Sequence, residues 1–243
     1  MMKEHFLVGS NKAFAEPNIY GDKSSLILEW LLLIGVKKEQ FSIREIAGAT
    51  GISLGQVQKV VGVLTMNGNL EVIGVRTAKR FILKRPQNLL QKWLEHYSLI
   101  KKCKMHSYHT AFQGRHELIE ALSKSSMNKK VVLALHSAAD TLKFKNTNLD
   151  TLELYLLDVD SRLQVEKLLK LEPQERGYEV LLIEPYYKSL LYHSPTSEDT
   201  SLLHSPILLT LLDLYHFPLR GREQAEFMAE RLPDLKRIYK REH

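Results

Sequence analysis

The sequence has a single cysteine, Cys103, and no long uninterrupted apolar run. One cysteine cannot form a disulfide within the chain, which is typical of proteins that stay in a reducing cytoplasm. The longest apolar stretch, residues 26–36, contains Glu29 and is well short of the roughly 20 residues that a membrane-spanning helix needs. The N-terminal residues lead into no sustained apolar segment of the kind found in signal peptides. We therefore expect a cytoplasmic protein that has no membrane partner.

Acidic residues are scarce in the first part of the chain. Residues 1–105 contain 16 Lys and Arg against 8 Asp and Glu, a net charge of +8, whereas residues 106–243 contain 18 against 20, a net charge of −2. Because the whole basic excess lies in one part, that part is expected to bind nucleic acid or a charged membrane surface. On charge alone, a surface that only keeps the protein soluble is the alternative.

The length and composition allow two domains. At 243 residues, of which 44% are hydrophobic, the chain can build two cores of ordinary size. A basic segment at residues 101–104 ends the first part, so we expect domains of residues 1–105 and 106–243.

Local signals predict two short helices before residue 52. The first begins at Ser24 or Ser25, either of which can act as N-cap, and is closed by Gly35. The second follows a capping box in which Ser42 and Glu45 satisfy each other's backbone N–H groups. Joined by a glycine turn at Gly51 to an amphipathic third helix, this second helix gives the layout of a helix-turn-helix.

A third helix follows the turn at Gly51, with Ser53 as its N-cap. Apolar residues spaced by three and four positions form one face of it: Val57, Val60, Val61 and Leu64. The opposite face carries Ser53, Gln56, Gln58 and Lys59. Glutamine can pair with adenine, lysine can reach guanine or a phosphate, and a serine at a helix start suits a phosphate. Ordinary solvated positions are the alternative.

A hairpin is predicted directly behind this helix. Residues 70–75 and 80–83 have the composition of strands, and the turn between them contains Arg76, Lys79 and Arg80. A basic hairpin in this place is a wing that grips the DNA backbone. Winged helices also bind proteins, which is the alternative partner class. The expected DNA-contacting residues are Ser53, Gln56, Gln58, Lys59, Arg76, Lys79 and Arg80.

The second part of the chain alternates strands with helices. A helix that begins at Pro86 joins it to the winged helix. The expected strands cover residues 131–135, 152–157 and 179–183, and the expected helices cover residues 115–124, 161–171, 207–215 and 222–232. The predicted fold class is α+β, an N-terminal winged helix-turn-helix followed by a larger mixed α/β domain.

Three segments of the chain resemble one known family. They are Leu89-Leu90-Gln91-Lys92-Trp93, His136-Ser137-Ala138-Ala139-Asp140, and the closing run Ser205-Pro206, Leu212-Asp213-Leu214 and Arg220-Gly221-Arg222-Glu223-Gln224-Ala225. Together they are similar to the pattern of the AbiEi-type antitoxins, over roughly residues 24–232.

The resemblance implies a transcriptional regulator that represses its own promoter. Its second domain would have a degenerate nucleotidyltransferase-like fold, and its functional partner would be a nucleotidyltransferase-like toxin that it need not touch. Duplex DNA is the expected direct partner, and a homodimer is a further expectation.

An enzymatic role is the first alternative. Asp158 and Asp160 follow a predicted strand at a spacing that can hold Mg²⁺ for phosphoryl transfer, as in a nucleotidyltransferase. Such an enzyme also needs a Gly-Ser turn upstream to hold the phosphates, and no glycine lies between Gly114 and Gly177. An aspartate-rich turn explains the pair as well. We expect no enzymatic activity, no catalytic residue and no cofactor.

A zinc site is a further alternative. Cys103, His106 and His109, with His116 nearby, have the side chains of metal ligands at short spacing. No second cluster completes a tetrahedral site, so we expect a polar linker and no bound metal.

The second part contains serine-histidine neighbours and a group of tyrosines, two further candidate sites. Ser137, Ser194 and Ser205 each follow a histidine, but no Gly-x-Ser-x-Gly motif surrounds them, and they are better explained as turn starters than as hydrolase nucleophiles. Four tyrosines could line the effector pocket of a ligand-sensing regulator, although simple packing is their commoner role. They are Tyr178, Tyr186, Tyr187 and Tyr192.

Overall fold

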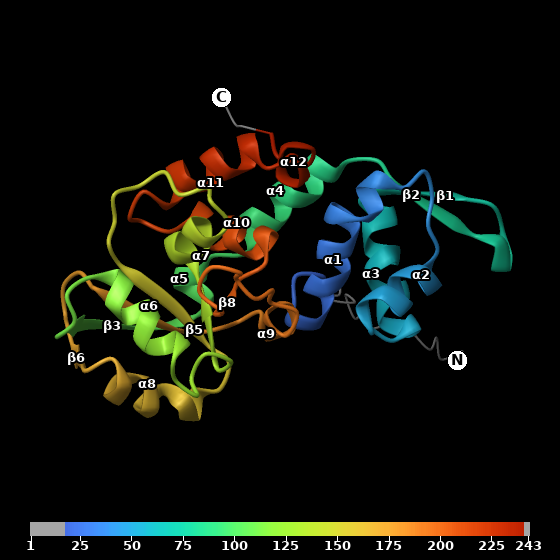
Figure 1. The fold of residues 1–243 in the computed structure, drawn as a ribbon. Coiled ribbons are helices and arrows are strands. Elements are labelled where there is room, and N and C mark those ends of the chain that lie inside the picture. Colours follow the sequence, from blue (N-terminus) through green and yellow to red (C-terminus); the bar gives the residue numbers. More distant parts are fainter. Residues whose placement is uncertain (1–17, 241–243) are drawn as a thin grey trace, which may run out of the picture.

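The computed structural model describes residues 18–240. Three helices and a hairpin lie at one end of the molecule, a mixed sheet lies at the other, and a group of helices lies between them (Figure 1). The first part contains α1 (Asp22–Leu33), the 3-10 turn η1 (Gly35–Lys37), α2 (Ile43–Thr50), α3 (Leu54–Met66), β1 (Leu70–Ile73), the 3-10 turn η2 (Arg76–Ala78) and β2 (Arg80–Leu83).

The remaining elements form the centre and the sheet. They are α4 (Pro86–His96), α5 (Leu99–Lys102), β3 (Lys104–Thr110), α6 (Arg115–Ser123), β4 (Val131–Leu133), α7 (Leu135–Thr141), β5 (Leu152–Leu156), η3 (Val159–Ser161), α8 (Arg162–Leu168), β6 (Leu171–Pro173), β7 (Val180–Glu184), α9 (Lys188–Leu191), β8 (Leu203–His204), α10 (Ile207–Tyr215), α11 (Gly221–Arg231) and α12 (Pro233–Lys236). This content confirms the predicted α+β class. Within residues 18–240, no helix is long and apolar enough to cross a membrane.

The first helix begins earlier than its serines predicted. Its N-cap is Gly21, and the hydroxyl of Ser25 donates to the carbonyl of Asp22 at 2.5 Å inside the first turn. The prediction of Ser24 or Ser25 as N-cap was therefore wrong. The carboxylate of Asp22 accepts hydrogen bonds from the backbone and hydroxyl of Ser189, at 2.8 and 2.7 Å. These bonds connect the start of α1 to the start of α9, Lys188–Leu191.

The predicted caps of the next two helices are confirmed. The hydroxyl of Ser42 accepts from the backbone of Glu45 at 3.2 Å, and the carboxylate of Glu45 accepts from the backbone of Ser42 at 2.8 Å. Gly51 follows α2 in the left-handed region at φ 69°, and Ser53 caps α3 through the backbone of Gln56. The predicted apolar face of α3 is buried: Val57, Val60, Val61 and Leu64.

The hairpin pairs β1 with β2 in antiparallel register. The strand expected over residues 70–75 ends at Ile73, because Gly74 turns the chain at φ 77°, and a Cβ there would lie 2.8 Å from the carbonyl oxygen of Ala78. Phe41 and Phe81 exchange backbone hydrogen bonds of 2.9 and 2.8 Å. The hairpin is therefore anchored at its base to the segment before α2.

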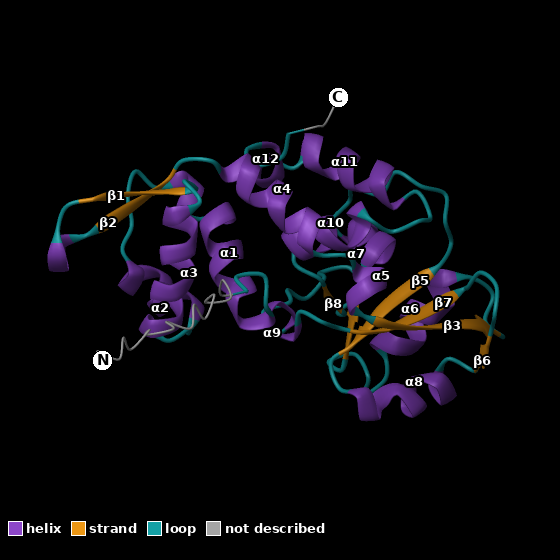
Figure 2. Ribbon diagram, turned by 180° about the vertical axis from the view of Figure 1, so that it is seen from behind, coloured by secondary structure: helices purple, strands orange, loops and turns teal. Residues whose placement is uncertain are grey.

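Helix α4 joins the two parts, with Pro86 at its first turn as predicted. Its side chains are buried against the second part. The indole of Trp93 donates to the hydroxyl of Tyr187 at 2.8 Å, and the hydroxyl of Tyr97 donates to Asp213 at 2.8 Å. One hydrophobic core runs through the first part, α4 and α10 to α12, which Figure 2 shows side by side from behind.

The second part is built on a six-stranded mixed sheet of order β6-β3-β7-β5-β4-β8. Alternate strand residues serve two cores. Tyr155 and Ile183 face the core of α7 and α10, whereas Leu154 and Leu182 face the core of α6 and α8. Helices therefore cover both faces of the sheet (Figures 1 and 2).

Several elements of this part differ from the sequence-based expectations. Residues 104–110, expected as a polar linker, are β3, which pairs with strands on both sides. The strand expected over 131–135 ends at Leu133 and is followed by α7. The helix expected over 161–171 ends at Leu168, and Leu171 begins β6. Short polar strands were missed because their hydrophobic alternation is weak.

Candidate nucleic-acid interface

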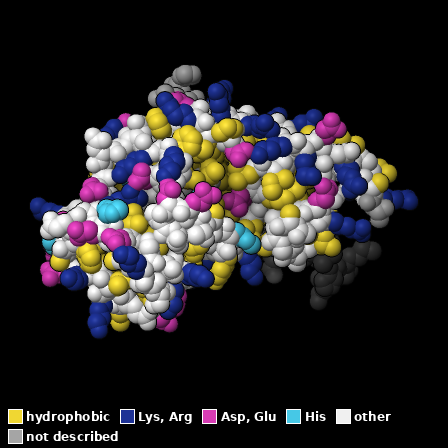
Figure 3. All heavy atoms as spheres, viewed as in Figure 1, with side chains coloured by type: hydrophobic (Ala, Val, Ile, Leu, Met, Phe, Trp, Pro, Cys, Tyr) yellow, Lys and Arg dark blue, Asp and Glu magenta, His cyan; other side chains and the backbone are white. Residues whose placement is uncertain are grey.

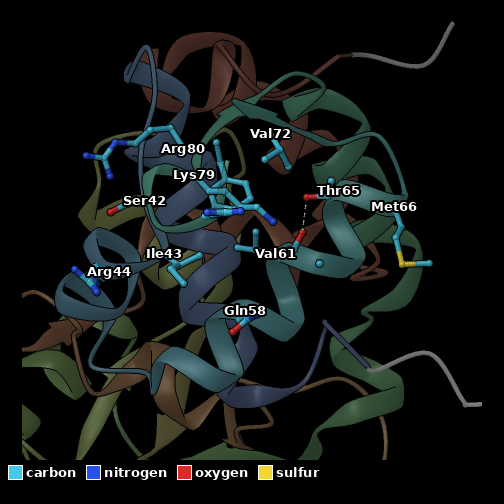
Figure 4. Close-up of a pocket in the computed structure, with 13 residues that line it drawn as sticks. Ser42, Ile43, Arg44, Gln58, Val61, Thr65, Met66, Val72, Lys79 and Arg80 are labelled. Atoms are coloured by element: carbon cyan, nitrogen blue, oxygen red, sulfur yellow. Dashed lines mark hydrogen bonds between the residues drawn. The ribbon is translucent and has the colours of Figure 1, made fainter. Parts of the chain in front are cut away.

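A groove lies between α3 and the hairpin, with a volume of about 610 Å³. Figure 4 shows Gln58, Val61 and Thr65 of α3 on one side and Lys79 and Arg80 of the hairpin on the other. The lining comes from the start of α2, from α3 and from both strands: Ser42, Ile43, Arg44, Gln58, Val61, Gly62, Thr65, Met66, Val72, Arg76, Lys79, Arg80 and Phe81. The lining is apolar at its base and basic along its rim.

The solvent face of α3 follows directly from the burial of its opposite side. With the valines packed inward, the exposed positions of α3 are Leu54, Gly55, Gln58, Lys59, Gly62 and Met66, most of them spaced by three and four residues. A Cβ added at Gly55 or Gly62 would meet no atom within 4 Å, so no neighbour within the described chain requires glycine there. Glycine inside a helix costs roughly 0.5–1 kcal/mol relative to alanine. This face therefore lacks side chains at two positions, and packing among the described residues does not explain why glycine occupies them.

Exposed cations surround the groove without acidic partners. None of the ion pairs among the described residues involves Arg44, Lys59, Arg76, Lys79 or Arg80. In the space-filling view, Lys and Arg gather toward the hairpin end, and Asp and Glu are more frequent at the end of the sheet (Figure 3). The groove therefore has a positive field that the acidic side chains of residues 18–240 do not neutralise.

The carboxylates closest in sequence to the groove have other partners. Glu45 caps α2 and pairs with Lys38 at 3.3 Å. The backbone N–H of Ser42, assisted by Lys38, lowers the pKa of this carboxyl. Glu71 pairs with Lys84 at 2.5 Å. Both carboxylates are thus held by residues outside the group of five cations.

The tip of the hairpin has a strained backbone. Arg76 is a non-glycine residue in the left-handed region, at φ 51°. Such a conformation costs of the order of 1–3 kcal/mol and is most frequent at binding sites. This strained residue is the basic Arg76 at the hairpin tip. Like the two exposed glycines of α3, it lowers the stability of the fold without a contact among the described residues that explains it.

The structure brings four of the seven sequence-predicted residues into the groove. Gln58, Arg76, Lys79 and Arg80 line it. Lys59 is exposed beside Gln58 but does not line the groove.

The other two predicted residues, Ser53 and Gln56, form hydrogen bonds within the fold. Ser53 is exposed and uses its oxygen as the N-cap of α3. The side-chain amide of Gln56 donates to the hydroxyl of Ser24 on α1 at 3.0 Å. Gln56 is therefore turned toward the fold and not toward the outer face where we expected it.

Sequence reasoning missed two residues of the groove. Arg44 belongs to α2 and reaches the groove only because α2 packs against α3. Its only local signal is that a basic residue lies inside the capping box, between Ser42 and Glu45. Gly62 was not considered in the sequence analysis, although a glycine in the middle of an exposed helical face is unusual.

The aspartate pair lies far from this groove, at the turn after β5. Asp158 and Asp160 are exposed, and the carboxylate of Asp158 accepts from the backbone of Asp160 at 3.0 Å. This is the local geometry of an aspartate turn. No group of three metal-ligating side chains occurs in residues 18–240.

The cysteine and histidines of the zinc alternative do not converge. Cys103 is buried, where its sulfur accepts from the backbone of Tyr186 at 3.4 Å. His106 contacts Glu184 at 3.1 Å and His109 contacts Glu179 at 2.7 Å. Because the two histidines are three residues apart on β3, their side chains leave opposite faces of the sheet.

No serine-histidine pair forms either. Ser137 lies in α7, so its interpretation as a turn starter was wrong, and its hydroxyl donates to Glu153 at 2.6 Å. The neighbouring ring of His136 contacts the carbonyl of Leu219 instead. The tyrosines also separate: Tyr187 is buried, whereas Tyr192 is 76% exposed, so they do not line one pocket.

Residues of the closing run have structural roles. Asp213 is fully buried and holds Tyr97, and the hydroxyl of Ser205 bonds that of Thr210 at 2.6 Å. A Cβ at Gly221 would lie 2.4 Å from the carbonyl oxygen of Leu214, so only glycine fits. The run therefore specifies how α10 and α11 pack.

Comparison with protein-family models, with curated proteins and with solved structures gave no match for this chain.

Proposed function

We propose that this protein is a transcriptional regulator that binds duplex DNA through the groove between α3 and the hairpin, as a winged helix-turn-helix. The observation that carries the proposal is a groove lined by four exposed cations, with Lys59 exposed on the adjoining face of α3, and none of the five has an acidic partner among the described residues. A cluster of unpaired cations raises the local concentration of polyanions, and each phosphate contact releases counterions.

The shape of the groove supports DNA as the polyanion. Helix α3 presents a face with two glycines, which lets backbone or base edges approach closely. The hairpin adds Arg76 and Lys79 to the lining of the same groove. In this arrangement α3 lies in the major groove and the hairpin grips the adjacent backbone.

Base preference is assigned to Gln58. Its side chain is on the outer face of α3 and, within the described chain, has no hydrogen-bond partner, whereas Gln56 is bonded to Ser24. A glutamine amide can pair with both N6 and N7 of adenine.

The resemblance to the AbiEi-type antitoxins extends the proposal. It implies a cytoplasmic repressor of its own promoter whose functional partner is a nucleotidyltransferase-like toxin. In this proposal the second part of the chain is not a catalyst, because the aspartate pair forms an exposed turn and no phosphate-holding glycine loop precedes it.

A protein ligand is the second candidate. Met66 is 83% exposed and Val72 is 37% exposed in the groove lining, so an acidic segment with apolar side chains would also find complementary contacts. The apolar share of such binding would change little with salt, so its affinity should depend on salt less steeply than DNA binding does.

Replacing Arg76, Lys79 and Arg80 together by alanine is expected to weaken binding to duplexes of every sequence. Each lost phosphate contact removes about 0.9 from the slope of log affinity against log salt, so the slope should fall by roughly 3. The measurement is fluorescence anisotropy with labelled duplexes at a series of salt concentrations. The whole chain must be used, because removing residues 106–243 would expose the buried faces of Trp93 and Tyr97.

The matched control replaces three exposed cations of the second part: Lys129, Lys167 and Arg176. It removes the same charge and should leave the salt slope unchanged. Equal losses in the two triple variants would mean that DNA responds to net charge alone, and the groove would lose its role.

Gln58→Ala is expected to act differently from the loss of hairpin charge. It should leave the salt slope unchanged and reduce the preference for the best duplex by about 1–3 kcal/mol, because one base contact is lost. Gln56→Ala should not change the preference, since that amide is bonded to Ser24. A panel of duplex variants measures both, and a Gln58→Ala protein with unaltered sequence preference would remove Gln58 from the base contacts.

A further inference from the structure

A second and smaller pocket shares no lining residue with the groove between α3 and the hairpin. It has a volume of about 190 Å³ and lies among α1, the end of α2 and the loop after α9. Its lining is Leu26, Glu29, Trp30, Leu33, Ile34, Ala49, Thr50 and His193. Seven of these residues belong to the first part of the chain, and His193 belongs to the second.

The pocket has one carboxylate in an apolar wall. Leu26, Glu29 and Leu33 lie on one face of α1, at spacings of three and four residues, and Ile34 at the end of the helix is 46% exposed. Glu29 itself is mostly buried, and its carboxylate makes no hydrogen bond or ion pair with any described residue. The hydroxyl of Thr50, one candidate donor in the lining, donates to the carbonyl of Ile46 at 2.7 Å.

An unpartnered carboxylate in apolar surroundings costs free energy. Burial raises the pKa of Glu29 to about 7, with no charged neighbour contributing. A bound cation would relieve this cost, because a charge-assisted hydrogen bond would replace the lost hydration. An anion would be repelled, and a metal ion would lack ligands, since no group of three ligating side chains exists among residues 18–240.

We propose that this pocket binds a small organic cation with an apolar body, whose ammonium pairs with Glu29 and whose body packs on Leu26, Leu33 and Ile34. The size of the pocket restricts the ligand to a monoamine of about one ring. The site lies outside the groove, so its test needs no DNA.

The test uses isothermal titration calorimetry of the whole chain at pH 8 with three probes of similar shape: 2-phenylethylamine, 2-phenylethanol and 3-phenylpropionate. The amine should bind saturably, the alcohol at least tenfold more weakly, and the acid not at all. Glu29→Gln should weaken binding of the amine about 10- to 100-fold, the usual range for a hydrogen bond to a charged group, and leave the alcohol unchanged. Glu39→Gln removes an exposed carboxyl of the neighbouring loop and serves as the matched control.

The pH profile identifies the titrating group. Affinity for the amine should rise about tenfold per pH unit up to about pH 7 and level off above it, because only the ionised Glu29 pairs with a cation. The other titratable residue of the lining is His193, and the residues contributed by α2 do not titrate. The profile should persist in His193→Gln and disappear in Glu29→Gln.

Three results would overturn the assignment. They are equal affinity for the amine and the alcohol, unchanged amine affinity in Glu29→Gln, and a pH profile abolished by His193→Gln alone. The Glu29→Gln protein is expected to be folded and no less stable at pH 8, which a thermal unfolding curve checks, because the substitution removes a carboxylate that burial disfavours. Absence of saturable amine binding to the folded wild-type protein would also reject the site.

Discussion

Gly62→Glu is expected to abolish DNA binding while leaving the protein at least as stable as the wild type. Gly62 lies in the middle of α3 and lines the groove, and a Cβ there would meet no atom of the described chain within 4 Å. Replacing an exposed helical glycine by a better helix former adds roughly 0.5–1 kcal/mol to the free energy of unfolding. The new carboxylate, however, would face the DNA phosphates and compete for the cations. Like charges brought together cost several kcal/mol, which corresponds to about 100-fold or more in affinity.

A matched substitution is available on the neighbouring helix. Gly48 of α2 is also exposed and free of neighbours within 4 Å, but it does not line the groove. Gly48→Glu therefore makes the same chemical change and the same gain in helix propensity, and should lower DNA affinity no more than a few-fold. Urea unfolding and fluorescence anisotropy on both variants measure the two effects. If Gly62→Glu binds DNA as tightly as Gly48→Glu, α3 does not face the DNA.

The second large effect is expected at Glu153, in the middle of the sheet. This residue is fully buried, and its carboxylate accepts from four donors. The donors are the backbone of Ser137 at 2.9 Å, the hydroxyl of Ser137 at 2.6 Å, the hydroxyl of Thr151 at 2.5 Å and the hydroxyl of Tyr178 at 3.2 Å. Glu153→Ala leaves these donors buried without an acceptor and opens a cavity. We expect a loss of about 3–5 kcal/mol in the free energy of unfolding.

Glu172→Ala is the control for this change. Glu172 is an exposed glutamate on the edge strand β6, and its loss should change stability by no more than about 0.5 kcal/mol. Urea unfolding followed by circular dichroism measures both variants. A Glu153→Ala protein as stable as Glu172→Ala would show that the four hydrogen bonds contribute nothing net.

The first part of the fold could be predicted because its signals are local. The capping box of Ser42 and Glu45, the left-handed turn at Gly51 and the apolar face of α3 each depend on residues within a few positions of one another. Contacts between distant residues were not predicted: the carboxylate of Asp22, at the start of α1, accepts hydrogen bonds from Ser189 at the start of α9. The strand β3 was missed for the same reason, since its polar sequence is stabilised by pairing with β6 and β7.

The sequence predicted that the candidate site is basic, but it did not predict all the residues that line it. Arg76, Lys79 and Arg80 follow from the composition of the turn, and the structure places all three at the groove. Gln56 and Gln58 could not be separated from sequence, because only the packing of α1 brings Ser24 within 3.0 Å of Gln56. Arg44 joins the groove through the contact of α2 with α3, which no short motif encodes.

The central claim is that DNA lies against α3 and the hairpin, and the single cysteine allows a direct measurement. Cys103 is buried, and burial raises the pKa of its thiol to about 11, so it reacts poorly with thiol reagents. Gln58→Cys introduces an exposed thiol at the groove, to which an iron-EDTA group can be attached. Lys167→Cys places the same group on α8, outside the groove. At equal occupancy of a labelled duplex, the Gln58→Cys conjugate should cut the bound DNA at a few adjacent positions and the Lys167→Cys conjugate should not. Equal cutting from both positions, or no cutting from Gln58→Cys on a duplex that the protein retains, would contradict this account.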